Sequence, residues 1–430
     1  MKNKGIFGGI IVVVLILVLT LAVGGGSVSA EEPTIIASGD CGKAGSNVTW
    51  TLDSTGLLTI SGEGEMEIYS SVNENGWITT APWQNRASKL IIQEGVTSIG
   101  GYAFYNCGAL KSVTIPDSVT SIGEDAFSGC TGLTEIIYNA REAANLTYKS
   151  EVFKNAGTSS GSFRVVIGDS VEKIPSCLFY DCTSLSSVKI GNSVTSIGSN
   201  AFYGCTGLTS VAIPDSVSSI EHYAFYGCTG LTSVAIPDSV SSIGSNAFYG
   251  CTGLSSVTIP DSVTSIGSNA FEDCTGLTSV TISDSVTSIG WGAFSGCTRL
   301  RDITIPDSVT SIGSGAFSYC WGLTSVTIPD SVTSIGDYAF IGCTRLTSVT
   351  IGNGVTSIGY NAFYDCSNLT SVYFNAKECA DFKENSDVFG SAGKKTEGVT
   401  ITFGKNVQNI PSYLCYGSKY NSYTEKYYYS

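Results

Sequence analysis

CTGLTSVAIPDSVSSIEHYAFYG (residues 205–227) is followed without a gap by CTGLTSVAIPDSVSSIGSNAFYG (residues 228–250). Each stretch is 23 residues long, and the two differ only at three consecutive positions, 221–223 in the first. A fixed short period is typical of solenoid proteins, in which each unit forms one turn and packs only on its neighbours. We therefore expect this unit to determine the fold.

The same unit recurs through most of the chain. Cysteines mark one offset of the unit, and nearly all follow each other at steps of 23 residues: Cys107, Cys130, Cys182, Cys205, Cys228, Cys251, Cys274, Cys297, Cys320, Cys343 and Cys366. Two units are lengthened to 29 residues, one after Cys130 and one after Cys366. The array therefore comprises about fourteen units and covers residues 84–417.

The apolar positions within a unit predict how it folds. Val211 and Ile213 alternate with small polar or neutral residues, which indicates a strand with one buried face. Pro214-Asp215 then favours a turn, because proline cannot donate a hydrogen bond to a strand ladder. Ala224-Phe225 is expected in a second turn that closes the coil. One unit cannot bury its apolar residues alone, so the sequence predicts a β-rich solenoid of stacked parallel strands.

The ends of the chain depart from this pattern. Residues 1–30 combine Lys2 and Lys4 with an apolar run and a small-residue site before Glu31, which predicts an export signal, either cleaved or kept as an anchor. Residues 31–83 contain a β-hairpin pattern around the turn 53–56 and are expected to cap the first coil. Residues 418–430 are a tyrosine-rich tail that either covers the last turn or simply ends the chain.

Composition limits the classes of partner. The formal net charge is -14, and the basic residues are scattered along the sequence without a cluster. A nucleic-acid partner would require a face of Lys and Arg, so none is expected.

The cysteine ladder permits several interpretations. Equivalent cysteines in adjacent turns would lie close together, but their side chains would point the same way, which disfavours disulfides. A one-dimensional row does not converge on a zinc ion. We therefore expect buried free thiols that fill a corner of the coil, with the S–H donating to a turn carbonyl. Cys41, Cys177, Cys379 and Cys415 lie outside the ladder, and one disulfide among them stays open.

Aspartates form a second row, after the proline of most units. Its members are Asp117, Asp215, Asp238, Asp261, Asp284, Asp307 and Asp330. Each turn offers one carboxylate, whereas calcium requires six to eight oxygen ligands, so turn hydrogen bonding is the favoured interpretation. Weak calcium binding is the alternative.

Aromatic residues give the best candidate for a recognition surface. Tyr180, Tyr203, Tyr226 and Tyr249 occupy one offset in successive units, whereas Tyr223, Trp291, Trp321, Tyr338 and Tyr360 occur at variable turn positions. The core offsets are already filled, so these rings are expected either to contact a partner or to lie flat on the turns.

The residues needed for catalysis are not assembled in the sequence. The single histidine, His222, stands where neighbouring units carry serine, and the expected strand face is Ser and Thr without a carboxylate cluster. We expect no enzyme activity and no small-molecule cofactor.

The repeat resembles a known family. The pattern Cys-x-x-Leu-x-x-Val-x-Ile-Pro-x-x-Val-x-x-Ile-x-x-x-Ala-Phe looks like the BspA-like leucine-rich repeat over residues 84–417, and residues 31–83 are similar to the leader domain that often precedes such arrays. The resemblance implies a leucine-rich-repeat coil and a secreted or cell-surface adhesin that binds extracellular proteins, cells or glycans. Two other functions stay open: a structural surface-layer or spacer element, and a solenoid enzyme acting on polysaccharide.

Overall fold

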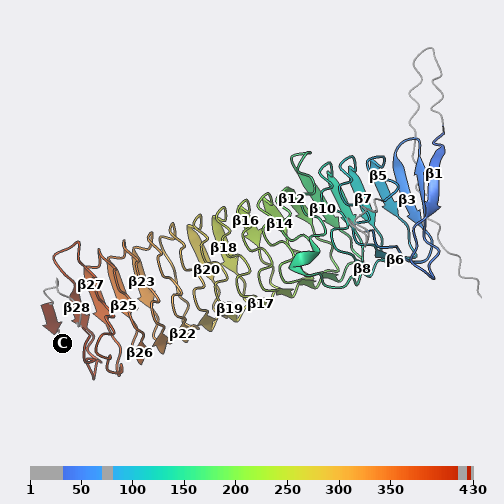
Figure 1. Ribbon diagram of the computed structural model, residues 1–430. Helices are drawn as coiled ribbons and strands as arrows, with labels where there is room; N and C mark the ends of the chain where they lie inside the picture. Colours follow the sequence, from blue (N-terminus) through green and yellow to red (C-terminus); the bar gives the residue numbers. More distant parts are fainter. Residues whose placement is uncertain (1–31, 70–80, 415–423, 428–430) are drawn as a thin grey trace, which may run out of the picture.

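The computed structural model describes residues 32–69, 81–414 and 424–427, and the predicted export signal at 1–30 lies outside this range. The chain winds into an elongated parallel β-solenoid (Figure 1), so the predicted fold class is confirmed. Within the described residues no helix has the length and apolar character to cross a membrane, and the one helix is the 3-10 turn η1 (Tyr148–Ser150).

One long side of the solenoid carries the longer strands. They form a ten-stranded, a two-stranded and a five-stranded sheet. Their bounds are β1 Ile35–Asp40, β2 Thr49–Asp53, β3 Leu57–Ser61, β5 Lys89–Ile92, β7 Ser112–Ile115, β9 Glu135–Tyr138, β10 Phe163–Ile167, β12 Leu185–Lys189, β14 Ser210–Ala212 and β16 Ser233–Ala235; then β18 Ser256–Ile259 and β20 Ser279–Ile282; then β23 Ser325–Ile328, β25 Ser348–Ile351, β27 Ser371–Phe374, β28 Thr400–Phe403 and β29 Thr424–Tyr427.

A second side carries short strands, most of them formed by the Ser-Ile pair of a unit. A three-stranded and a nine-stranded sheet result. Their bounds are β4 Gly64–Glu65, β6 Val96–Ile99 and β8 Ser121–Ile122; then β11 Lys173–Ile174, β13 Ser196–Ile197, β15 Ser219–Ile220, β17 Ser242–Ile243, β19 Ser265–Ile266, β21 Ser288–Ile289, β22 Ser311–Ile312, β24 Ser334–Ile335 and β26 Ser357–Ile358.

Strand register follows the spacing of the repeat. In β12 and β14, Val188 pairs with Val211, 23 residues later. The lengthened units keep this register by placing their extra residues outside the strands, since Ile136 of β9 pairs with Val165 of β10. Matched offsets therefore occupy equivalent places in successive turns.

The N-terminal segment joins the solenoid directly. The expected hairpin is present, with Thr51 of β2 opposite Thr59 of β3, and β1 adds a further antiparallel strand that the sequence did not predict. Strand β3 also pairs in parallel with β5, placing Leu58 beside Leu90. The segment thus covers the first coil by extending its sheet. The division of the chain at residues 83 and 84 stays a prediction.

At the other end, β29 pairs in parallel with β28. The predicted tail at 418–430 therefore contains a strand laid on the last coil, which is one of the two alternatives that the sequence left open. The remaining residues of this tail lie outside the described range.

The long-strand side is interrupted in the middle of the array. The ten-stranded sheet stops at β16, and residues 302–305 form no strand between β20 and β23. This corrects the expectation of a strand in every unit. Ile303 and Ile305 remain buried, and the short-strand sheet continues past the same turns, so the coil itself is intact.

A column of phenylalanine rings runs through the core. Consecutive rings from Phe104 to Phe389 stack with centroids 5.0–5.6 Å apart. Trp83 continues the column into the first coil, where its ring lies 5.6 Å from Phe104 and its indole N–H donates to the carbonyl of Ala103. Such offset stacks are favourable at this separation.

The cysteine ladder lies beside this column. All described cysteines are buried and free, including Cys41, Cys177 and Cys379; Cys415 lies outside the described residues. The thiol of Cys228 donates to the carbonyl of Phe202, one turn earlier, at 3.2 Å, and the same contact recurs from Cys130 to Cys366. Burial raises the pKa of the Cys107 and Cys320 thiols to about 12.

Replacing one ring of the column tests the core. Phe225→Ala removes a ring that is fully buried between Phe202 and Phe248. The expected loss is about 3–5 kcal/mol in the free energy of unfolding, measured by urea denaturation. Phe225→Leu keeps most of the buried volume and should lose less. A Phe225→Ala curve that superimposes on the parent curve would contradict the buried position.

The buried thiols predict a loss of stability at alkaline pH. Their pKa values are raised in the folded chain, so stability is fully present below pH 9.0, the unperturbed pKa, and falls as pH rises toward about 12. Each thiol contributes a slope of up to about 1.4 kcal/mol per pH unit in that window. Urea unfolding between pH 8 and pH 11 should therefore show a shallower decline for Cys205→Ala/Cys228→Ala than for the parent. Parallel declines would contradict the assignment.

Candidate functional site

The first row of predicted aromatic residues forms a continuous stack. Tyr180, Tyr203, Tyr226 and Tyr249 lie with ring centroids 4.6–4.7 Å apart and nearly parallel planes. All four rings are only partly exposed. At its end the hydroxyl of Tyr249 donates to Asp273 at 3.0 Å, and burial together with this carboxylate raises the pKa of Tyr249. The structure therefore brings these residues together, but most of their ring faces are used in stacking.

The second group of predicted aromatics is more exposed. Tyr223, Trp291, Trp321, Tyr338 and Tyr360 have between 39% and 58% of their surface accessible. Tyr338 and Tyr360 form an edge-to-face pair with centroids 5.6 Å apart, whereas Tyr223 contacts Tyr226 of the stack at 5.9 Å. Exposed aromatic rings supply large contact area at low conformational cost, so these residues remain the better candidates for recognition.

Backbone conformation distinguishes two of these tyrosines. Tyr223 and Tyr338 have φ of 58° and 59°, in the left-handed region. Neighbouring turns place Asn200 and Asn246 or a glycine at this offset, and these residue types accept that conformation readily. A bulky side chain there is disfavoured by about 1–2 kcal/mol. The tyrosines thus occupy positions where folding alone favours another residue.

Hydroxyl side chains on the turns link neighbouring coils, a role that the sequence did not reveal. Ser216 and Ser239, which follow the aspartate of the Pro-Asp turn, donate to the carbonyls of Val194 and Val217 in the preceding turn, each at 2.7 Å. Thr232 donates to the carbonyl of Thr209 at 3.2 Å in the same way. Part of the Ser/Thr content therefore stabilises the stack and is not free for binding.

The aspartate row offers no grouped ligand set. Apart from the partly exposed Asp117, the row is exposed to solvent. Asp330 accepts a hydrogen bond from the backbone of Asn353 at 2.8 Å, which is structural turn chemistry. In the described part of the chain, no group of three or more His, Cys, Asp or Glu side chains could hold a metal ion. The calcium alternative thus gains no support from the geometry.

His222 lies on the surface and accepts a hydrogen bond through Nδ1 from the backbone N–H of Ser245 at 2.9 Å. This contact bridges two turns.

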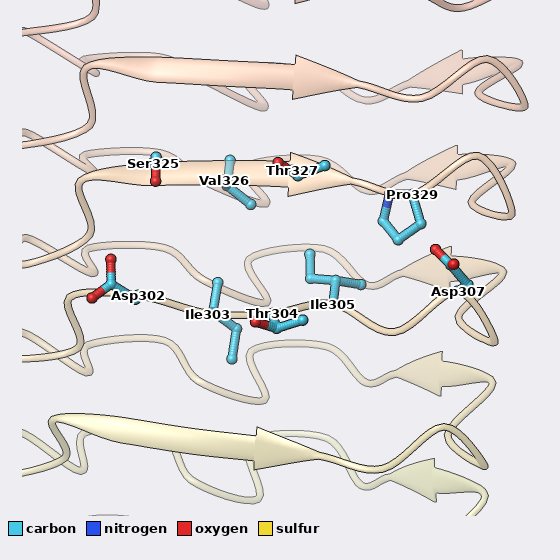
Figure 2. Close-up of a pocket in the computed structure, with 9 residues that line it drawn as sticks. All are labelled: Asp302, Ile303, Thr304, Ile305, Asp307, Ser325, Val326, Thr327 and Pro329. Carbon is cyan, nitrogen blue, oxygen red and sulfur yellow. The ribbon is translucent and has the colours of Figure 1, made fainter.

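A groove of about 360 Å³ opens where the long-strand sheet is interrupted (Figure 2). Asp302, Thr304, Ser325 and Thr327 line it with polar groups from two adjoining turns. Figure 2 shows Asp302 at the end near Ser325 and Asp307 at the opposite end near Pro329. The groove therefore presents carboxylates and hydroxyls, which can bind the hydroxyl groups of a ligand.

Sequence reasoning missed three exposed side chains in this part of the array. Tyr319 is exposed, as are Arg299 and Arg345, which occupy one offset two turns apart. The signal was present in the sequence, because each of the three replaces a glycine found at the same offset in neighbouring units.

Comparison with known proteins agrees with this geometry. The chain matches the family described as BspA type leucine-rich repeat region (6 copies) over residues 83–159, 147–278, 264–389 and 312–425. No curated protein matches at a significant level.

Three solved structures illustrate the similarity. A leucine-rich repeat protein from Bacteroides ovatus is 26% identical, with a TM-score of 0.54, over 83% of this chain and 98% of that one. A leucine-rich cell surface protein from Faecalibacterium prausnitzii is 29% identical, with a TM-score of 0.41, over 77% and 93%. The pneumococcal vaccine antigen PcpA is 17% identical, with a TM-score of 0.50, over 88% and 97%, and is similar in fold.

The family match spans most of the sequence, and its repeat coincides with the turns of the solenoid. The chain therefore belongs to the BspA type leucine-rich repeat family.

Proposed function

We propose that this protein is a secreted or cell-surface interaction protein that binds an extracellular macromolecule through the aromatic side chains on its turns. Family membership supports a surface protein-interaction role in general terms. The observation that carries the proposal is the pair Tyr223 and Tyr338, which are exposed and held in a left-handed conformation. Strained residues that folding does not require are commonly found at functional sites.

The local sequence supports the same proposal. Residues 205–227 and 228–250 differ only at 221–223, where Glu221-His222-Tyr223 replaces Gly-Ser-Asn. His222 and Tyr223 are exposed, and the core residues of the two turns are identical. Variation therefore falls on the outer turn, which is the part of the solenoid that a partner can contact.

The proposed role is binding without catalysis. The contacts found at the aromatic turns are ring packing and turn hydrogen bonds, such as that between His222 and Ser245. Exposed tyrosine and tryptophan side chains suit protein and glycan ligands, because one part of each ring is apolar and the other can hydrogen-bond. We propose extracellular proteins, cell surfaces or glycans as the partners.

Substituting the two strained tyrosines separates function from folding. Tyr223→Asn/Tyr338→Asn places at both positions the residue found in neighbouring turns, so the free energy of unfolding should stay unchanged or rise by about 1–2 kcal/mol per site. Binding of the full chain to a panel of matrix proteins, cells and glycans should weaken.

The control is Thr258→Ala, which alters an exposed position on strand β18. Equal binding by the tyrosine variant and the parent would exclude these side chains. Self-association of the parent in analytical ultracentrifugation, without any bound partner, would favour a structural spacer instead.

A further inference from the structure

An isolated group of positive charges lies in the middle of the solenoid. Between Lys189 and Lys377 the only Lys or Arg residues are Arg299, Arg301 and Arg345, in a chain with a net charge of -14. All three are exposed. Within the described part of the chain, none of them forms an ion pair. Their guanidinium groups are therefore available to a ligand.

The fold places these arginines within three successive turns. Arg299 and Arg345 occupy the same offset, and Gly322 occupies it in the turn between them. A Cβ on Gly322 would lie 2.7 Å from the carbonyl oxygen of Leu300 and 3.0 Å from the carbonyl carbon of Arg299, so these turns are in direct contact. The backbone N–H of Thr324 donates to the backbone carbonyl of Arg301 at 3.1 Å. Two turns correspond to roughly 10 Å along the axis.

Two exposed aromatic rings accompany the arginines. Trp321 belongs to the turn between Arg299 and Arg345 and stands where most units carry threonine. Tyr319 has φ of 56° at an offset where adjoining turns have Gly296 and Gly342, and its ring would contact a Cβ on Gly342 at 2.7 Å. The tyrosine ring therefore lies over a glycine that leaves room for it.

We infer that the arginine–tryptophan patch, formed by Arg299, Arg301, Trp321 and Arg345, binds a linear polysaccharide that carries one carboxylate or sulfate in each disaccharide. This inference rests on the proposed binding function and names its ligand class. Arginine binds carboxylate and sulfate groups through paired hydrogen bonds. The face of the Trp321 indole suits the apolar face of a sugar ring.

The spacing of the arginines fits this ligand. Arg299 and Arg345 are separated by two turns, a distance comparable with the length of a disaccharide. A chain laid along the solenoid axis would present one acidic group to each arginine and a sugar ring to Trp321 between them. A nucleic-acid strand carries one phosphate per ~3.4 Å and would require a longer basic row.

The adjoining groove supplies further contacts for a sugar. It begins beside Arg301, at Asp302, and is lined by Thr304 and Ser325. These side chains can hydrogen-bond the hydroxyl groups of a sugar, and polyglutamate has no hydroxyl groups. Asp302 also opposes the positive charge of the patch, so its neutralisation should strengthen binding of an anion.

Binding of the full chain to hyaluronan, neutral dextran and polyglutamate tests the inference. The parent should bind hyaluronan, more tightly at low salt, and should not bind dextran. Arg299→Gln/Arg345→Gln should raise the Kd for hyaluronan by at least roughly tenfold, because each charged hydrogen bond contributes about that factor. Trp321→Thr should raise the Kd several-fold, and Asp302→Asn should lower it.

The matched control is Lys111→Gln/Lys189→Gln, which removes the same charge from two exposed positions outside the patch. It should leave the Kd for hyaluronan unchanged, and thermal melts should show that every variant is folded. An equal loss in the control and the patch variant would overturn the inference, as would absence of hyaluronan binding or preferential binding of polyglutamate. None of these results decides the test of the proposed function, because that test changes Tyr223 and Tyr338, which lie outside the patch.

Discussion

Register-matched stacking of successive turns is the constraint on which the whole molecule depends. Most turns pair their long strand and their Ser-Ile strand with equivalent residues 23 positions away, as Val188 does with Val211 and Ile197 with Ile220. Neighbouring turns are also joined by hydrogen bonds from the Ser216 hydroxyl and the Cys228 thiol and by the stacking of phenylalanine rings. Because every one of these contacts requires the same spacing, a shift of one residue would break them all together.

This constraint separates the inside of the coil from its surface. Packing fixes the residues that face the core. The units 205–227 and 228–250 differ only at 221–223, and the exposed residues that depart from the repeat include Tyr223, Trp321 and Arg345. Outward residues can change without disturbing neighbours, because each turn contacts only those above and below it. The solenoid thus acts as a rigid support on which recognition side chains are placed at regular intervals.

Periodic features were predictable from the sequence, and interruptions of the period were not. The alternation around Val211 and the phenylalanine at 225 repeat many times, so strand and core positions followed directly. The pairing of β3 with β5 was missed, because their register spans 32 residues (Leu58 to Leu90) and Trp83 replaces the usual phenylalanine. The interruption at 302–305 was missed, because Ile303 and Ile305 keep the apolar alternation of the other units. Contacts between turns were also missed. Tyr203 stacks on the tyrosine of the next turn, and Arg299 and Arg345 lie on the turns on either side of Trp321.

Deleting one whole unit tests the stacking account most directly. Removal of residues 228–250 joins Gly227 to Cys251 and preserves every register, so the chain should fold cooperatively and its maximum dimension in X-ray scattering should shorten by about 5 Å. Removal of residues 228–239 alone leaves one incomplete turn before Cys251, so the turns on its two sides can no longer stack in register and the single cooperative melt should be lost. If both deletions had the same effect on melting, the continuous stacked core described for this protein would be contradicted.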